Sequence, residues 1–565
     1  MVKKKWQTKG NNSELIESLN KTTNLNPVVL NLLINRGINT EDKIKNFLEH
    51  DISYLHDPFL LPDMDKAVAR IKKAVENKEK IAVFGDYDVD GITGVSVLLL
   101  YLRDELKADV CYYIPDRLKE GYGLNMDALN ALADDGVTLI VTVDCGITAS
   151  EEAKEITKRG VEMIITDHHE CQNELPECVA VVNPKREDSE YPYRELAGVG
   201  VAFKLIQALA GNKDNEYLLE KYSEIVALGT VADIVPLLDE NRILVAYGIK
   251  YMRNDKNFGL KSLLDVANLT SAEVNAGTLG FQIAPRINAA GRMGNANVAV
   301  ELFAGTDKQK IVEIAKELNE ENNIRQSVEQ QILEEAKQMV RDEKLENKNI
   351  IILAKEGWHN GVIGIVASRI TEEFYRPCIL ISLEDGIGKG SCRSIKGVNI
   401  YELLTENKDT LIKFGGHELA AGISIDVDKI PEFKEKMLAS TSKIITNEIL
   451  TKTISIDAEI AEDQMTIPFV KELNLLEPYG MGNPQPTFII KNAKIAKIAA
   501  LKDGKHLKLI VCKKKKSVDC IGFSMGHYVE SLRVGDTVSL ACNLYINDYR
   551  GECYFGVRIR DIRLS

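Results

Sequence analysis

The sequence predicts an α/β protein of several domains: a parallel sheet covered by helices, a smaller α/β domain joined to it by a long helix, and a C-terminal β-barrel. Three observations lead to this fold class. The chain of 565 residues is too long for one compact core. From about residue 80 to residue 233, short β-branched runs alternate with helix-like stretches, which is the rhythm of a parallel sheet. From about residue 452 onward, short strands follow one another.

The order of these patterns divides the chain into five expected parts. A charged segment at 307–346 has helical periodicity and contains neither proline nor glycine, so we expect a long connecting helix. The strand spacing after it suits a small barrel of the oligonucleotide-binding type, although other β-barrels fit equally well. The expected parts are a helical segment at 1–75, which carries no readable chemistry, the sheet domain at 76–306, the helix at 307–346, the second α/β domain at 347–445 and the barrel at 446–565.

The composition is that of an ordinary globular protein. Apolar residues make up 45% of the chain and charged residues 27%. No apolar stretch follows the basic start MVKKKWQTKG, and nowhere do 18 apolar residues run together. We therefore expect a cytoplasmic protein that does not enter a membrane. The ten cysteines include no CxxC unit, which disfavours a zinc site or a disulfide framework.

The net charge leaves the substrate class open. With 71 basic and 84 acidic residues the charge is −13, which at first sight argues against nucleic acid as a partner. Two divalent cations among five aspartates would reduce a local charge of −5 to about −1. An acidic chain can therefore still present a site that accepts phosphate.

Acidic residues and histidines follow three strands of the predicted sheet. Asp86, Asp88 and Asp90 come after the run 81–84, Asp144 ends the run 139–143, and the triplet 167–169 ends the run 163–166. Ligands of parallel sheets bind beyond the carboxyl ends of the strands. We therefore expect these side chains to meet at one edge of the sheet.

The three clustered aspartates are candidate metal ligands. They lie at i, i+2 and i+4, so a continuing strand would point all three in the same direction, with Gly91 allowing a tight turn after them. Such carboxylates repel one another unless cations lie between them, and Mg²⁺ or Mn²⁺ prefers oxygen ligands. A calcium loop of the EF-hand type also begins with DxDxDG, but here a buried strand precedes it and its twelfth position, Val97, is apolar.

The remaining candidate ligands complete a two-metal site. His168 and His169 offer imidazole nitrogens, which Mn²⁺ accepts better than Mg²⁺ does. Taken alone, Asp144 could cap a helix and Asp233 could be a turn residue before Pro236. Taken together, the candidate ligands predict that Asp144 bridges two metals. Asp88 would bind one metal, and Asp90, His168 and Asp233 would bind the other. Two such metals activate water and stabilise phosphate charge, which indicates hydrolysis of phosphodiester bonds.

Several motifs resemble those of the DHH phosphoesterase superfamily, named for the triplet that stands here at Asp167, His168 and His169. The resemblance extends from about Asn26 to the C-terminus. The motifs look most like those of the single-strand-specific exonucleases of that superfamily. The motifs include GDYDVDGITG, VTVDCGI, ITDHH, ALGTVADIVPL, APRINAAGRMG, GSCRSIKG, FGGHELAAG and LEPYGMGNPQP. The resemblance implies a DHH domain, a DHH-associated domain and an OB-like barrel. It also implies 5′ to 3′ degradation of single-stranded DNA to mononucleotides in repair and recombination.

The same resemblance implies residue roles, cofactors and partners. The cofactors are two divalent cations, Mn²⁺ or Mg²⁺, and the partners of this monomer are single-stranded DNA, a helicase and a single-strand-binding protein. His169 would lie against the phosphate and act in catalysis with Asp86 and Asp144. The implied metal ligands are Asp86, Asp88, Asp90, Asp144, His168 and Asp233, and the implied substrate contacts are Arg117, Arg292, Ser391, Arg393 and His417.

For some of these residues a plainer role stays open. Each arginine could be a solvated surface residue, and His417 could be a structural residue of a glycine turn. Trp358 and His359 could contact a nucleotide, but a buried tryptophan is at least as consistent with the pattern. The lysines at 513–516 could follow a DNA backbone, although a solvated hairpin turn is favoured.

Two other functions fit parts of the sequence. The same metals could serve a DHH phosphodiesterase that acts on short oligonucleotides or cyclic dinucleotides, but the barrel and the GMGNPQP segment favour a long polymer. A catalytically silent DNA-binding scaffold would have lost metal ligands. Every expected ligand is present here.

Overall fold

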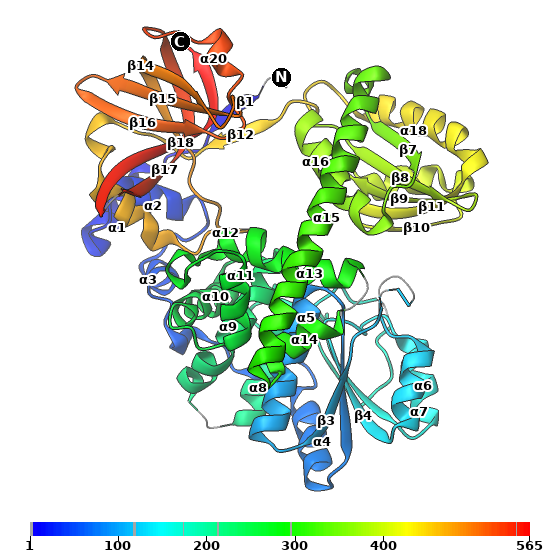
Figure 1. The fold of residues 1–565 in the computed structure, drawn as a ribbon. Coiled ribbons are helices and arrows are strands. Elements are labelled where there is room, and N and C mark those ends of the chain that lie inside the picture. The colour runs from blue at the N-terminus through cyan, green and yellow to red at the C-terminus, as the bar shows by residue number, and fades with distance from the viewer. Residues whose placement is uncertain are drawn as a thin grey trace. The chain divides into compact units, whose positions relative to one another are not determined.

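The computed structural model describes residues 4–116, 120–121, 123–172, 174–211, 214–293, 296–549 and 551–565, without the side chains of residues 292, 293, 548 and 549. The chain forms two compact units (Figure 1). The larger unit combines Thr8–Glu317 with Ser455–Ser565, and the smaller combines Met1–Gln7 with Leu318–Ile454.

The larger unit contains a five-stranded parallel sheet with the strand order β3-β2-β4-β5-β6. The strands are β2 (Lys80–Gly85), β3 (Asp109–Tyr113), β4 (Val137–Val143), β5 (Glu162–Thr166) and β6 (Ala180–Val182). The register pairs Gly85 with Val143 and Val143 with Thr166. Three neighbouring strands therefore end at the same level, and the residue after each of them is an aspartate.

Helices cover both faces of this sheet, as its nearly continuous buried strands require. On one face, α6 (Met126–Asp134) and α7 (Ser150–Lys158) pack against Phe84, Ile140 and Ile165. The other face carries α4 (Met64–Glu76), α5 (Val89–Leu100) and α8 (Gly198–Ala210), with α9 (Asn215–Ala232) and α10 (Asp239–Met252) behind them. Further helices are α11 (Phe258–Val266), α12 (Ala276–Thr278), α13 (Ala284–Met293) and α14 (Asn297–Ala304).

The C-terminal strands close into a five-stranded barrel, because β14 pairs with both β15 and β17. Its strands are β14 (Phe488–Leu501), β15 (His506–Lys513), β16 (Lys516–Gly522), β17 (Thr537–Tyr549) and β18 (Glu552–Leu564), with β13 (Ala458–Glu459), α19 (Ile467–Leu473) and α20 (Tyr528–Ser531) beside them. The barrel core is continuous with that of three N-terminal helices, α1 (Ser13–Thr23), α2 (Pro27–Ile34) and α3 (Glu41–Glu49). Segments more than 400 residues apart thus share one hydrophobic core.

The N-terminal segment is not entirely helical, which differs from the expectation. Strand β1 (Lys5–Thr8) pairs with β12 (Thr453–Ile456), and the Lys5 amide donates to the Lys452 carbonyl at 2.9 Å. The partner of β1 lies far along the chain, so local sequence pattern does not reveal this strand.

The smaller unit is a mixed five-stranded sheet with the order β10-β11-β9-β8-β7. Its strands are β7 (Ile351–Glu356), β8 (Cys378–Glu384), β9 (Ile387–Arg393), β10 (Lys413–Gly416) and β11 (Ala420–Asp426). One face packs on α16 (Asn360–Phe374) and on the end of the long helix α15 (Lys308–Asp342), and the other face on α17 (Ile400–Glu406) and α18 (Ile430–Ile444). The boundary between the two units falls within α15.

These elements confirm the predicted fold class: a parallel-sheet domain, a smaller α/β domain after a long helix, and a closed C-terminal barrel. Within the described ranges, no helix combines the length and the apolar character needed to span a membrane.

Candidate metal centre

The aligned strand ends bring three aspartates side by side. Asp86 follows β2, Asp144 follows β4 and Asp167 follows β5, and all three are buried. The Asp144 amide donates to the Thr166 carbonyl at 3.1 Å, so Asp144 extends the ladder by one residue. Its backbone then turns into the left-handed region, with φ +61°. Asp144 therefore does not cap a helix, and the next helix begins only at Ser150.

The expected continuation of the strand through Asp86, Asp88 and Asp90 is wrong. Strand β2 ends at Gly85, Asp88 is the N-cap of α5, and Asp90 lies in the first turn of that helix. The Asp88 carboxylate accepts from the amides of Asp90 and Gly91 at 2.9 and 3.1 Å. This capping stabilises the helix start, whereas an extended segment would leave both amides without that partner.

Asp90 is held by the N-terminus of α8. Its Oδ2 accepts from the Gly198 amide at 2.6 Å and its Oδ1 from the Val199 amide at 2.8 Å. Burial and the neighbouring Asp88 raise the pKa of Asp90 to about 7, although the two amides favour its ionised form. A Cβ at Gly198 would lie 2.7 Å from Asp144 Oδ1, so glycine is needed for this close approach.

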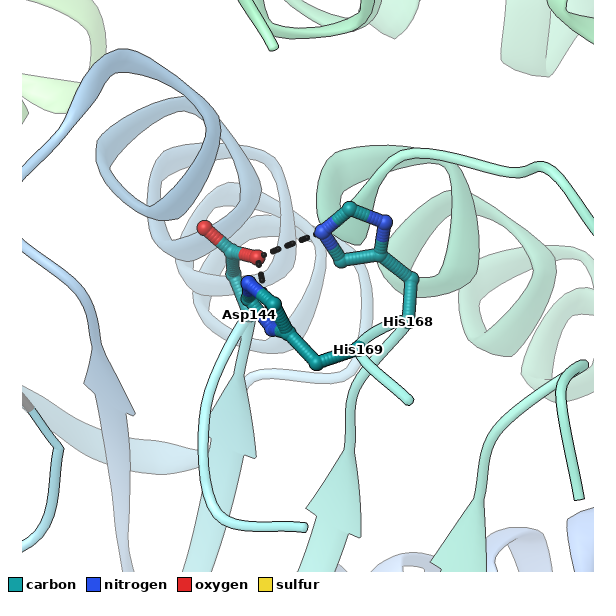
Figure 2. A group of neighbouring side chains, drawn as sticks. All are labelled: Asp144, His168 and His169. Atoms are coloured by element: carbon teal, nitrogen blue, oxygen red, sulfur yellow. Dashed lines mark ion pairs between the residues drawn. The ribbon is translucent and has the colours of Figure 1, made fainter. Parts of the chain in front are cut away.

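His168 faces three carboxylates, as Figure 2 shows in part. Its Nε2 lies 3.1 Å from Asp144 Oδ1, 3.6 Å from Asp233 Oδ2 and 3.8 Å from Asp90 Oδ2. Burial lowers the pKa of His168 to about 4, helped by the charge of His169. Its imidazole is therefore neutral at pH 7, which is the form that binds metals.

His169 is oriented by Asp167, whose carboxylate accepts from His169 Nδ1 at 2.7 Å and from the Ile147 amide at 2.9 Å. Burial acts against ionisation of Asp167, but these hydrogen bonds prevail and lower its pKa. Burial also acts against protonation of His169, but Asp167 and the more distant Asp90 and Asp88 prevail and raise its pKa. The His169 side chain is 44% exposed, so it can reach a bound molecule.

The carboxylate oxygens and imidazole nitrogens of these residues form three overlapping groups of potential metal ligands. Within each group the ligand atoms lie within 4.8 Å of one another. The groups are Asp86, Asp88 and Asp144; Asp90, His168 and Asp233; and Asp144, His168 and His169. Asp144 belongs to the first and the third of these groups, and His168 to the second and the third.

The electrostatics of the cluster fit divalent cations. Burial and the neighbouring carboxylates raise the pKa of Asp144 well above its usual range and that of Asp233 to about 9. Asp144 Oδ1, Asp233 Oδ2 and His168 Nε2 are buried, and in the described part of the chain none of them makes a hydrogen bond. Buried polar atoms of this kind require a partner. Carboxylate oxygens and an imidazole nitrogen in a buried acidic cluster suit Mn²⁺ or Mg²⁺.

Comparison with known proteins agrees with this geometry. Family models match three parts of the chain: the DHH family N-terminal domain at 80–230, the DHHA1 domain at 347–443 and the RecJ OB domain at 456–561. The single-stranded-DNA-specific exonuclease RecJ of Bacillus subtilis is 38% identical over 566 residues, covering 100% of this chain and 71% of the relative.

The chain belongs to the RecJ family. Two crystal structures of RecJ from Thermus thermophilus have the same fold. The complex with Mn²⁺ has a TM-score of 0.84 and 31% identity, covering 99% of this chain and 80% of that one. The complex with Mg²⁺ has a TM-score of 0.77 and 28% identity, covering 99% and 78%.

The other site residues expected from the family resemblance lie in the smaller unit or fall, wholly or by their side chains, outside the described residues. Arg117 falls outside the described residues, and Arg292 lies in α13 with its side chain outside the description. Ser391 and Arg393 lie on β9 in the smaller unit, where Arg393 donates to Ser391 Oγ at 3.1 Å. A Cβ at Gly364 would lie 2.9 Å from Ser391 Oγ, so this glycine leaves room for the pair. Sequence reasoning missed Gly364, although it stands in the stretch GVIGIVAS.

The two histidines and the tryptophan of the smaller unit have distinct environments. His417 is exposed between β10 and β11, and its amide donates to the Ala420 carbonyl at 2.8 Å. Trp358 is buried, and its indole nitrogen donates to Glu335 at 2.8 Å. His359 is the N-cap of α16. Trp358 is therefore a buried anchor, which is the plainer of its two expected roles.

The barrel carries a surface that sequence reasoning missed. Lys513 pairs with Lys516 across the turn between β15 and β16, and Lys514 and Lys515 are exposed, so these lysines form the favoured hairpin turn. Elsewhere, Arg558 lies 5.5 Å from the ring centre of Phe523 and 5.9 Å from that of Tyr545. Phe523 is 53% exposed. We call Phe523, Tyr545 and Arg558 the barrel platform. The three residues come from separate segments of the chain, so no sequence motif joins them.

Proposed function

We propose that this chain is a two-metal-dependent exonuclease that hydrolyses single-stranded DNA. The observation that carries the proposal is the buried cluster of carboxylates and imidazole, which has raised carboxyl pKa values and atoms without hydrogen-bond partners among the described residues. Membership of the RecJ family supports it, because the relatives are named single-stranded-DNA-specific exonucleases.

The ligand groups suggest how two cations would be shared. Asp86, Asp88 and Asp144 would hold one cation, and Asp90, His168 and Asp233 the other. Asp144 would contribute to both, because its Oδ1 also lies 3.1 Å from His168 Nε2. The structures of relatives with Mn²⁺ and Mg²⁺ support these two cations as cofactors. Two bound cations supply an activated water and neutralise charge on the phosphate.

His169 would bind the scissile phosphate. Asp167 accepts from its Nδ1 and raises its pKa, so the imidazolium form is favoured and its other nitrogen can donate. A charged donor next to the metals would bind the phosphate strongly and stabilise the charge that develops during attack.

Contacts with the terminal phosphate of the strand would determine the direction of degradation. We assign these contacts to Arg117, Arg292, Ser391, Arg393 and His417. The planar fork of an arginine donates in pairs to phosphate oxygens, and Ser391 is already oriented by Arg393. We therefore propose attack from the 5′ end with release of 5′-mononucleotides, by a monomer working in the cytoplasm in DNA repair and recombination. A helicase and a single-strand-binding protein would supply the single strands.

The decisive experiment follows strands labelled at one end. A 5′-phosphorylated single strand of about 40 nucleotides, labelled at either end, is incubated with the full chain in Mn²⁺ or Mg²⁺. Immediate release of a mononucleotide from the 5′ label, with a shortening ladder from the 3′ label, is expected. A mononucleotide released first from the 3′ label would contradict the assigned direction. Turnover of dinucleotides alone would instead favour the short-substrate phosphodiesterase.

A further inference from the structure

The chain directly after Asp233 has an unfavourable backbone conformation. Asp233 is the C-cap of α9, and the next residue, Ile234, has φ +64° and is 69% exposed. At the other end of this connection, Asp239 has φ +46°. A β-branched residue in the left-handed region persists only where its surroundings hold it there. Some other part of the molecule must therefore fix the segment that carries Asp233.

The GMGN stretch that precedes the barrel lies directly on this segment. The Leu237 amide donates to the Met481 carbonyl at 2.8 Å. A Cβ at Gly480 would lie 2.6 Å from Leu237 Cδ1, and one at Gly482 3.1 Å from Leu238 Cδ1. Gly482 also has φ +71°. A side chain at Gly480 would displace Leu237, and one at Gly482 would strain a backbone conformation that favours glycine.

A buried arginine holds the residues that lie directly before the GMGN stretch. Arg242 in α10 is 2% exposed and donates to the carbonyls of Leu476 at 3.1 Å, Glu477 at 2.7 Å and Pro478 at 3.2 Å. Asn483 Nδ2 donates to two of these same carbonyls, those of Leu476 at 2.7 Å and Pro478 at 2.9 Å. Arg242 Nε also donates, to the Phe47 carbonyl at 2.8 Å. Its hydrogen bonds are therefore directed at main-chain oxygens.

These contacts connect the segment after Asp233 to residues 476–481 at two places. The segment 234–238 leads from Asp233 into α10, α10 carries Arg242, Arg242 holds the carbonyls of 476–478, and Met481 returns to Leu237. We infer that residues 475–483, which we call the pre-barrel clamp, are a positioning element for Asp233. The clamp sets the distance of Asp233 from Asp90 and His168, and with it the affinity of that ligand group for its cation. This inference rests on the proposed two-metal site.

The test measures Mn²⁺ binding to the full chain without DNA, by calorimetry and by electron paramagnetic resonance. The wild type is expected to bind two Mn²⁺. Gly482→Ala should weaken one of them by about 10- to 100-fold, as loss of an outer-shell support does, and leave the other unchanged. Asp233→Asn should weaken the same ion, and the double variant should add little to the effect of Asp233→Asn alone. The matched control is Gly535→Ala, at a barrel glycine with φ +98° and no atom within 4 Å.

A second variant guards against a simple folding defect. Asn483→Ala removes the two side-chain hydrogen bonds of Asn483 and adds no bulk, so it should give the same selective loss. Equal weakening of both ions, or a lowered melting temperature with unchanged Mn²⁺ affinity in both clamp variants, would overturn the inference. A wild type with a single Mn²⁺ site would overturn it as well. Normal Mn²⁺ binding with no hydrolysis of single-stranded DNA would instead refute the proposed function and leave the clamp intact.

Discussion

Neighbouring carboxylates at the metal centre have opposite pKa shifts, and the causes distinguish their roles. Asp167 has a lowered pKa because His169 and backbone amides donate to it, although burial acts in the other direction. Asp144 has a raised pKa because it is buried among four other carboxylates. The first carboxylate is satisfied by the protein itself and orients His169. The second has the environment expected of a ligand for a cation.

This difference predicts the behaviour of Asp144→Asn. We expect hydrolysis in Mn²⁺ to fall on the order of 1,000-fold or more, because the shared ligand is lost. The metal-free protein should melt about 2–4 °C higher, because one repelling carboxylate is removed. Thermal melting with and without Mn²⁺, beside an assay on labelled single strands, measures both effects. Unchanged turnover would refute the two-metal assignment.

His50 predicts a pH dependence of stability. Burial and the nearby Arg242 lower its pKa from 6.5 to about 4. Between these values the unfolded state binds more protons, so stability is lost as the pH falls from about 6.5 toward 4, by at most about 3 kcal/mol. Urea unfolding at pH 7.5 and pH 5 measures the change. His168 also has a low pKa, so the difference between the wild type and His50→Gln isolates His50, and identical slopes would contradict the assignment.

At the scale of elements, two helix starts build the ligand cluster. Asp88 caps α5, and the first amides of α8 hold Asp90. A helix N-terminus favours a carboxylate through its free amides and its dipole. The strand ends supply Asp86, Asp144 and Asp167 at one level, so strand register and helix starts together determine the geometry.

Gly198→Ala tests the approach of α8 to Asp144. The added methyl would lie 2.6 Å from Asp144 Cβ, so we expect Mn²⁺ affinity to fall about 10- to 100-fold and stability to fall by about 1–3 kcal/mol. The matched control is Gly200→Ala in the same helix, where the nearest atom to the new methyl lies at 3.4 Å. Titration of Mn²⁺ and urea unfolding measure both variants. Equal affinities in the two would show that the close approach is not required.

At the scale of the whole molecule, the barrel is part of the larger unit's architecture. Its core is continuous with that of the N-terminal helices, and Arg242 bonds to the segment that precedes it. Deleting the chain from residue 452 would expose this core and remove the clamp, so a truncation would not report on DNA binding alone. Point substitutions on the barrel surface separate binding from folding.

We expect the double variant Phe523→Ala, Arg558→Ala to bind long single strands about 10-fold more weakly. An exposed aromatic ring beside an arginine can stack on a base, and such stacking contributes about 1–3 kcal/mol per base. Cleavage of strands too short to reach the barrel should stay the same. Fluorescence anisotropy with labelled strands of increasing length measures binding, with Phe59→Ala, which removes another exposed ring, as the control. Equal affinity for long strands would remove the barrel platform from the substrate path.

Local sequence was sufficient for much of the fold and for the identity of the candidate ligands. Buried β-branched runs predicted the parallel sheet, and acidic residues at strand ends predicted a cluster, because parallel strands end at one edge. The strand assumed through Asp90 was wrong because helix capping by Asp88 outweighs continuation of the strand. Strand β1 was missed because its partner lies more than 440 residues away.

At the metal centre, the sequence determines which residue types are available, and the tertiary structure determines how they are grouped. The residue types that bind metals, and their places after strands, can be read from the chain because they follow from local periodicity and chemistry. The division into ligand groups, the pKa shifts and the clamp on Asp233 depend on burial and on contacts between segments far apart. Burial and long-range contacts arise only when the chain is folded. The affinity of each ligand group for its cation is therefore a property of the whole larger unit.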